Sequence, residues 1–273
     1  MSSQAAVKRI SLTTLQNMKK RGEKFAALTA YDACFAEMVS SAGIEVILVG
    51  DSLGMVLQGH DSTLPVTMDD IVYHMRCVQA GNQGAFIMAD LPFMSYAHEL
   101  QALESAAALM RAGAHMVKLE GGAWIAETTS RLAERGIPVC AHMGLTPQSI
   151  NRLGGFRVQG RNPEKAQLMI DEAVMLQNAG ASILLLECVP VSLAAEITRT
   201  LEIPVIGIGA GPEVDGQIMV MHDMLGITPP SIKLPRFVKN FLPESTDGVR
   251  GAFVAFREAV QSGAFPAPEH CFT

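Results

Sequence analysis

The chain has 273 residues, a formal net charge of −6 and a hydrophobic fraction of 49%. A composition this apolar excludes a disordered chain, and the acidic balance argues against nucleic-acid binding, which needs a basic face. No uncharged apolar run approaches the roughly 20 residues that span a bilayer. The first residues carry charges and no continuous apolar stretch, so neither a membrane partner nor a secretory signal is expected.

Short apolar segments rich in Val, Ile, Leu or Ala recur along the chain, and most end at Gly, Pro or an acidic residue. Seven of them predict strands, at residues 25–32, 45–51, 86–93, 115–122, 138–144, 182–189 and 204–211. A weaker eighth segment lies near residues 218–226, directly after Gly216 and Gln217.

Segments of helical periodicity separate these strands, at residues 99–113, 128–136, 163–180 and 192–201. Three of the segments close on Gly113, Gly136 and Gly180, and glycine is typical of the position that ends a helix. A last helix is predicted over residues 248–263.

Continuous apolar strands that alternate with helices are typical of a parallel sheet covered on its faces. An open doubly wound sheet would carry a G-x-G-x-x-G turn after its first strand, and this chain has none there. No linker or change of composition divides the chain. We therefore predict one domain over residues 1–273, a (β/α)8 or TIM barrel with extra N- and C-terminal helices.

Acidic residues close four of the predicted strands: Asp51, Asp90, Glu120 and Glu187. A single acid at this place serves equally well as a helix cap. In these barrels, however, the C-terminal strand ends form the active site, so all four are expected on one rim. Crowded carboxylates repel one another and favour a cation, and hard oxygen ligands without a Cys/His set favour Mg²⁺ over Zn²⁺.

Lys118 lies two residues before Glu120, so on a strand the two side chains share a face. If both point into the barrel, Val117 and Leu119 face the helices. A buried lysine needs a partner. Three roles stay open: a structural ion pair, an anchor for an anionic substrate, and a Schiff-base nucleophile.

Two weaker features accompany these residues. His142 ends the fifth predicted strand, where it either lines the mouth or makes a structural hydrogen bond. The glycine-rich GIGAG (207–211) permits a close approach of the backbone to a phosphate or other ligand, although such a cluster is a weak signal by itself.

Long motifs in a fixed order resemble the ketopantoate hydroxymethyltransferase family. They are GDSLGMVLQGHDSTLPVTMDDIVYH (50–74), ADLPFMSY (89–96), VKLEGG (117–122), AHMGLTPQS (141–149), LLLECVP (184–190) and IGIGAGP (206–212). The resemblance runs from about Ile10 to Phe253 without a departure at any of the family's site positions, and is least specific after Pro243.

This resemblance implies a reaction in pantothenate and coenzyme A biosynthesis. The one-carbon unit of 5,10-methylenetetrahydrofolate is transferred to 3-methyl-2-oxobutanoate through an enolate, with Mg²⁺ as cofactor. It also implies site residues: Asp51, Asp90 and Glu120 for Mg²⁺, Asp51, Ser52, Asp90 and Lys118 for the oxo acid, and Glu187 as the general base. The residues alone indicated the acids and Lys118, but not Ser52, the substrate or folate.

Two other functions remain open. One is a metal-dependent C–C lyase or mutase that acts on a 2-oxo acid without folate, as in the phosphoenolpyruvate mutase and isocitrate lyase group, whose barrel we expect this fold to resemble. The other is a barrel that binds an oxo acid without catalysis.

The cellular setting and the assembly are also expectations. The five cysteines are odd in number and none forms a C-x-x-C pair, which fits a reducing cytoplasm. The family resemblance implies a homo-oligomer, often a decamer.

Overall fold

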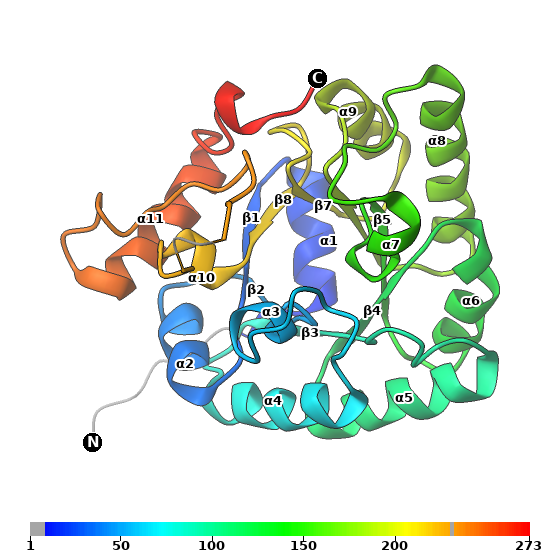
Figure 1. Cartoon of the computed structure of the whole chain (residues 1–273), viewed down its shortest axis with the longest axis horizontal. Helices are drawn as coiled ribbons and strands as arrows, with labels where there is room; N and C mark the ends of the chain where they lie inside the picture. Colours follow the sequence, from blue (N-terminus) through cyan, green and yellow to red (C-terminus); the bar gives the residue numbers. More distant parts are fainter. Residues whose placement is uncertain (1–8, 230–231) are drawn as a thin grey trace.

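Eight parallel strands close into a barrel in the computed structural model of the chain, which describes residues 9–229 and 232–273 (Figure 1). Each strand pairs with the next along the chain, and the last pairs with the first. The strands are β1 (Phe25–Thr29), β2 (Val46–Val49), β3 (Phe86–Asp90), β4 (Met116–Glu120), β5 (Val139–Gly144), β6 (Ile183–Glu187), β7 (Val205–Ile208) and β8 (Gly216–Met219). The predicted barrel is confirmed.

The strands are shorter than the apolar segments that predicted them. The segment 45–51, for example, contains β2 (Val46–Val49), and Asp51 lies beyond the strand in the turn that follows. The difference arises because the loops at the C-terminal ends of the strands are themselves buried. Apolar residues therefore continue beyond the last residue that is hydrogen-bonded in the sheet. The eighth strand begins earlier than predicted, at Gly216, and the second half of the predicted segment forms a short helix, α10 (Met221–Met224).

Helices surround the barrel (Figure 1). The longer outer ones are α2 (Ala33–Ser41), α4 (Met68–Gly81), α5 (Glu99–Ala112), α6 (Ala126–Glu134), α8 (Pro163–Asn178), α9 (Val191–Thr200) and α11 (Gly248–Ser262). The short ones, besides α10, are α3 (Leu53–Val56), α7 (Ile150–Leu153), η1 (Ala123–Ile125), η2 (Pro147–Ser149) and η3 (Pro268–His270). No helix of the described chain has the length and apolar character that a membrane span requires.

The helices differ from the prediction between β7 and β8. Residues 209–215 join these strands without a helix, so the seventh β/α unit is incomplete. The C-terminal helix α11, predicted as an extra element, packs against β1 and α2 and covers the barrel where the helix after β8 belongs. The predicted helix ends hold: Gly113, Gly136 and Gly180 all have positive φ angles.

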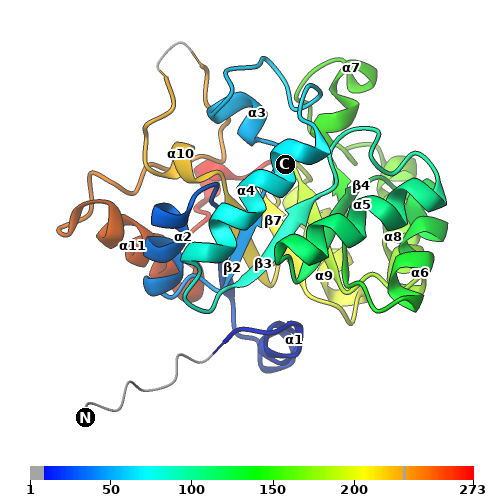
Figure 2. The same cartoon turned by 90° about the horizontal axis from the view of Figure 1, so that it is seen from below.

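An N-terminal helix, α1 (Leu12–Arg21), lies across the bottom of the barrel (Figure 2). Ser11 and Thr14 form its capping box. Its apolar side chains, Leu15 and Met18, join the cluster that fills the barrel interior. Lys19 pairs with Asp215 at 2.8 Å, which ties the helix to the loop before β8. The N-terminal end of the barrel is thereby closed, and the interior opens at the other end.

Side chains alternate along the strands between two cores. Phe25 and Ala27 of β1 belong to the interior cluster, whereas Ala26 and Leu28 pack toward the helices. In β4, Val117 and Leu119 likewise belong to the outer core. The period of two therefore directs Lys118 and Glu120 inward, as predicted.

Candidate active site

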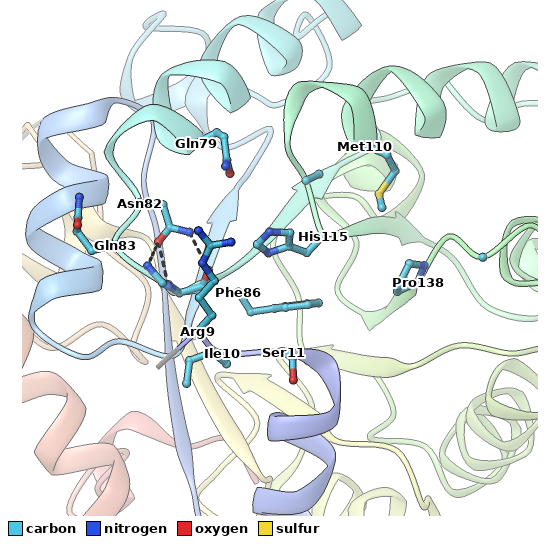
Figure 3. Close-up of a pocket in the computed structure, with 14 residues that line it drawn as sticks. Arg9, Ile10, Ser11, Gln79, Asn82, Gln83, Phe86, Met110, His115 and Pro138 are labelled. Carbon is cyan, nitrogen blue, oxygen red and sulfur yellow. Dashed lines mark hydrogen bonds between the residues drawn. The ribbon is translucent and has the colours of Figure 1, made fainter. Parts of the chain in front are cut away.

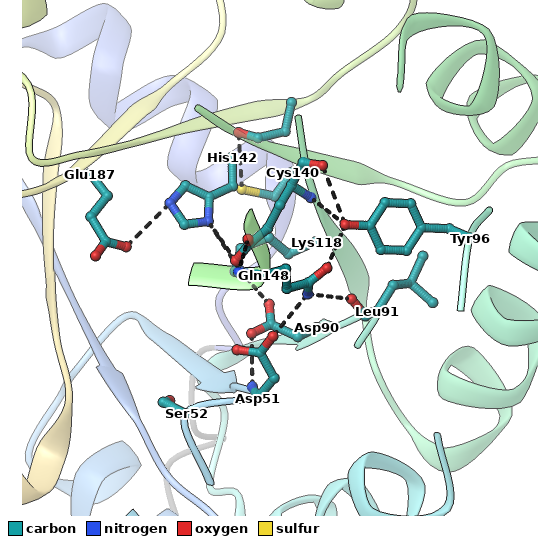
Figure 4. Close-up of polar contacts among 12 residues, drawn as sticks. Asp51, Ser52, Asp90, Leu91, Tyr96, Lys118, Cys140, His142, Gln148 and Glu187 are labelled. Atoms are coloured by element: carbon teal, nitrogen blue, oxygen red, sulfur yellow. Dashed lines mark hydrogen bonds and ion pairs between the residues drawn. The ribbon is translucent and has the colours of Figure 1, made fainter. Parts of the chain in front are cut away.

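The register of adjacent strands brings charged residues together at the C-terminal end of the barrel. Asp90 of β3 is the partner of Lys118 on β4, and Glu120 is the partner of His142 on β5. Figure 4 shows the side chains of Asp90, Lys118 and His142 converging. One cavity is lined by every site residue predicted from the sequence: Asp51, Ser52, Asp90, Lys118, Glu120 and Glu187.

Lys118 lies at the centre of this group. Its Nζ atom is 2.6 Å from Asp90 Oδ1 and 3.7 Å from Glu120 Oε1, and its side chain is only 4% exposed. Burial by itself disfavours the charged amine, but Asp90, Glu120 and Asp51 outweigh it and raise the pKa of Lys118 above its usual value. The residue is therefore a buried ammonium ion that faces the carboxylates.

Asp51 and Ser52 follow β2 and begin the turn into α3. The backbone N–H of Asp51 donates a 2.9 Å hydrogen bond to Asp90 Oδ2, which joins the ends of β2 and β3. The Ser52 hydroxyl lies 2.9 Å from the hydroxyl of Tyr31, a buried side chain from the loop after β1. These contacts fix a hydroxyl beside two carboxylates on the floor of the cavity.

His142 bridges two acids. Its Nδ1 atom is 3.2 Å from Glu120 Oε1, and its Nε2 atom is 3.3 Å from Glu187 Oε2, in range of an ion pair although not aligned for a hydrogen bond. Burial and Lys118 oppose protonation, yet Glu120 and Glu187 prevail and raise the pKa of His142 to about 9. The imidazole is thus a cation between two carboxylates, and the open choice about His142 resolves in favour of a cavity residue.

The pKa values of two of the acids are shifted in opposite directions. Burial, followed by repulsion from Asp90 and Glu120, raises the pKa of Asp51 well above its usual value. Burial acts in the same sense on Glu120, but His142 and then Lys118 overcome it and lower the pKa of Glu120. Of these two acids, Asp51 is the one whose negative charge the protein compensates less, and an added cation would stabilise that charge.

Gln148 also belongs to the site, although the sequence analysis did not single it out. It lies in η2, after β5, and its side-chain amide donates to Asp51 Oδ2 at 2.8 Å. Its backbone N–H donates to Glu120 Oε2 at 2.9 Å. The Tyr96 hydroxyl donates to Gln148 Oε1 at 2.6 Å (Figure 4). No local pattern reveals these contacts, because Gln148 is 97 residues away from Asp51 in the chain.

The cavity has a volume of about 640 Å³ and two chemically different halves. The floor is polar, and the outer half is apolar, with Lys233 and Arg236 among its residues. Its apolar lining includes Leu145, Phe156, Val158, Ile232, Leu234, Phe237 and Phe272. A pocket of this size holds a ligand much larger than a small oxo acid.

The glycine-rich GIGAG segment shapes this outer half. Gly209 has a φ of +61°, and a Cβ atom there would lie 2.8 Å from Phe237 and 3.0 Å from Phe272. The segment thus allows two aromatic side chains to pack onto the end of β7. The groups that come close to this glycine-rich backbone are therefore the side chains of Phe237 and Phe272, whereas the sequence had suggested a phosphate or other ligand.

A second cavity, of about 880 Å³, lies at the opposite end of the barrel (Figure 3). Among the described residues that line it, the one histidine is His115, which accepts a 3.0 Å hydrogen bond from the Ile87 N–H and packs against Phe86. None of these described lining residues is acidic. The candidate active site is therefore the cavity at the C-terminal strand ends, which is lined by the acids, Lys118 and His142. Enzymes with this fold carry their active sites at that end of the barrel.

The cavity at the C-terminal strand ends carries oxygen ligands of the type that a hard divalent cation prefers. Asp51, Asp90 and Glu120 are carboxylates at most 4% exposed. Within the described residues, no three Asp, Glu, His or Cys side chains form a ready-made metal cage. Mg²⁺ does not require one, because it commonly takes one or two carboxylates and completes its shell with water and substrate oxygens. The assignment of these three residues as ligands stays a prediction.

Solved structures with the same architecture define the class of barrel. A phosphonopyruvate hydrolase, solved in complex with oxalate and Mg²⁺, has a TM-score of 0.59 at 13% identity, covering 77% of this chain and 81% of its own. A 2,3-dimethylmalate lyase described as a PEP mutase/isocitrate lyase superfamily member has a TM-score of 0.57 at 14% identity, covering 80% of each chain. The fold is thus a (β/α)8 barrel similar to those of the phosphoenolpyruvate mutase/isocitrate lyase group, as expected.

Sequence comparison defines the family more narrowly. The family described as Ketopantoate hydroxymethyltransferase matches residues 9–268. A 3-methyl-2-oxobutanoate hydroxymethyltransferase of Marinobacter nauticus is 60% identical over 96% of this chain and 98% of its own length. Another, of Shewanella loihica, is 59% identical over 97% and 99%. The chain belongs to the ketopantoate hydroxymethyltransferase family.

Proposed function

We propose that this protein is a 3-methyl-2-oxobutanoate hydroxymethyltransferase of pantothenate and coenzyme A biosynthesis. In the proposed reaction, 5,10-methylenetetrahydrofolate, 3-methyl-2-oxobutanoate and water give 2-dehydropantoate and tetrahydrofolate. The observation that carries the proposal is the convergence of Asp51, Asp90 and Lys118 on one floor, with Glu187 on the wall beside them. Similarity to the phosphonopyruvate hydrolase and to the 2,3-dimethylmalate lyase is limited to the fold, at 13% and 14% identity, against 60% to a hydroxymethyltransferase.

The floor of the cavity suits the oxo acid and a metal ion. Asp51, Asp90 and Glu120 would hold Mg²⁺, directly or through water. Bound Mg²⁺ would act as a Lewis acid that polarises the C2 carbonyl and makes the C3 proton more acidic. Lys118 and the Ser52 hydroxyl supply a cation and a hydrogen bond for the substrate carboxylate.

Glu187 is the proposed general base. It ends β6, whereas the proposed metal ligands come from β3, β4 and the turn after β2, so it approaches the substrate from another side. Its carboxylate takes the C3 proton, and the electrons of the broken C–H bond move into the enolate of the oxo acid. The His142 cation holds Glu187 Oε2 at 3.3 Å, which orients the base. C3 then bonds to the one-carbon unit, and over the whole reaction both C–N bonds that join this unit to the folate break. Water supplies the hydroxyl oxygen, and the C3 proton together with one proton of water ends on the two folate nitrogens as tetrahydrofolate leaves.

The outer half of the cavity supports the use of a second, bulky substrate. Its apolar and aromatic lining suits the flat ring system of a folate, and Lys233 and Arg236, which also line the cavity, supply positive charge for its anionic tail. Because the donor carbon must reach C3, both substrates have to occupy this one cavity.

We also propose that the protein acts as a cytoplasmic homo-oligomer, following the family resemblance. Large apolar side chains exposed on the outer helices support burial against further copies: Tyr73, Leu100, Trp124, Leu168 and Met175. Sedimentation velocity measures the assembly, and a monomer at micromolar concentration would contradict this part of the proposal.

An assay for 2-dehydropantoate tests the function. The protein is incubated with 3-methyl-2-oxobutanoate and 5,10-methylenetetrahydrofolate, with and without EDTA, and Mg²⁺ is then restored. We expect product only with both substrates, loss of activity in EDTA and recovery with Mg²⁺, and severe impairment in Asp51→Ala and Asp90→Ala. Full activity in chelator would refute the metal site, and turnover of the oxo acid without folate would favour a lyase.

A further inference from the structure

Gln148 contacts two of the acids that line the cavity. It reaches two of the proposed metal ligands through two different atoms: the side-chain Nε2 binds Asp51 Oδ2 at 2.8 Å, and the backbone N–H binds Glu120 Oε2 at 2.9 Å. The side chain is buried, with the residue 7% exposed. Asp51 follows β2 and Glu120 ends β4, and β3 lies between these strands, so Gln148 joins carboxylates that the sheet holds apart.

The orientation of the Gln148 amide follows from its other partners. Its Nε2 atom also lies 2.9 Å from the carbonyl oxygen of Leu91, which only accepts hydrogen bonds, so the NH₂ group must be on that side. On the opposite side, the Tyr96 hydroxyl donates to Oε1. The backbone N–H of Glu120 approaches the same hydroxyl at 3.3 Å. The network therefore presents N–H donors, and not an oxygen, to Asp51.

The consequence concerns which carboxylate oxygens remain for a ligand. Gln148 takes Asp51 Oδ2 and Glu120 Oε2, and His142 and Lys118 face Glu120 Oε1. Lys118 and the Asp51 N–H take the two oxygens of Asp90. Within the described residues, Asp51 Oδ1 is the one oxygen of these three acids that makes no hydrogen bond or ion pair. We propose that Gln148, held by Tyr96, is a positioning residue that fixes Asp51 so that Oδ1 is offered to the metal ion.

This inference rests on the proposed Mg²⁺ site and is tested by metal binding without turnover. Gln148→Leu removes the amide but keeps the backbone N–H to Glu120. Isothermal titration calorimetry with Mg²⁺ alone should show that this variant binds the ion at least about tenfold more weakly than wild type. Loss of a group that orients a metal ligand usually weakens metal binding by about 10- to 100-fold. Tyr96→Phe should weaken binding by about threefold, because the amide keeps Leu91 as a partner. Gln167→Leu, exposed on α8, and Tyr73→Phe are the matched controls and should bind as wild type.

A second measurement separates positioning from a structural role. At saturating Mg²⁺, the KM of Gln148→Leu for the oxo acid should return to within about threefold of wild type, because the metal then occupies its site regardless of affinity. Wild-type Mg²⁺ affinity in Gln148→Leu, even with a lowered melting temperature, would overturn the inference. If that variant does not fold, unchanged affinity in Tyr96→Phe overturns it instead. Absence of Mg²⁺ binding to the wild-type protein would instead refute the metal site of the proposed function.

Discussion

The Nε2 atom of His142 lies 3.3 Å from Oε2 of Glu187, while Nδ1 of the same ring is 3.2 Å from Glu120. A buried imidazolium thus connects an acid on the floor of the cavity to the acid on its wall. This arrangement orients the proposed base by electrostatic attraction, and because the ring is only 2% exposed, water does little to weaken it.

The base is tested by Glu187→Gln. If Glu187 removes the C3 proton, the variant should exchange that proton of 3-methyl-2-oxobutanoate with D₂O about 10²–10⁴ times more slowly than wild type. It should still bind the oxo acid and Mg²⁺, because those contacts come from other strands. Proton NMR measures the exchange, and a wild-type rate would exclude Glu187 as the base.

The orienting role of His142 is tested by two substitutions that differ in reach. Asn places an amide near the Nδ1 position and keeps a contact with Glu120, whereas Gln extends toward Glu187. We expect His142→Asn to slow the C3 exchange on the order of 10- to 100-fold, as a misplaced base would, and His142→Gln to retain more of the rate. Equal rates in the two variants would show that contact with Glu187 does not matter.

The binding of Mg²⁺ should depend on pH because of Asp51. The pKa of Asp51 is raised, so its neutral form persists to higher pH than in an ordinary aspartate. A metal ion binds only the ionised form, so binding should release protons and weaken as the pH falls toward that pKa. Calorimetry in two buffers with different ionisation enthalpies counts the protons. Release as large in Asp51→Asn as in wild type would assign it to another group.

Lys118 should act through its charge and not through a covalent bond. The carboxylates raise its pKa, so the neutral amine that a Schiff base requires is scarce. Borohydride reduction in the presence of the oxo acid should therefore leave the mass of the intact protein unchanged. Lys118→Met is the control for adducts at other sites, and an adduct confined to the wild-type protein would establish a Schiff-base mechanism.

Glu45 should stabilise the fold away from the site. Its carboxylate accepts hydrogen bonds from the Ala26 N–H at 2.9 Å, from Arg257 at 3.2 Å and from Gln261 at 3.0 Å, and so joins α11 to the barrel. Glu45→Ala leaves the buried N–H unpaired and should lower the free energy of unfolding by about 1–3 kcal/mol. Urea denaturation measures the loss. Glu127→Ala, at an acid 79% exposed, should change stability by less than about 0.5 kcal/mol.

The sequence determined the architecture and which charged residues share one end of the barrel. The strand period of two sends Lys118 and Glu120 inward and Val117 and Leu119 outward, because successive side chains of a strand must point to opposite faces. Acids that close parallel strands of a barrel must share one rim, so Asp90, Glu120 and Glu187 could be grouped from their positions alone. Ser52, the substrate and folate came only with the family resemblance.

Tertiary structure decided how these residues meet. Strand register made Asp90 the neighbour of Lys118 and set His142 beside Glu120, and no local pattern encodes register. The link of residues 209–215 without a helix, and the contact of Gln148 with Asp51 across 97 residues of chain, were likewise visible only after folding. The physical reason is one of range: periodicity reports how each element faces its core, whereas contacts between distant segments depend on how all the elements pack together.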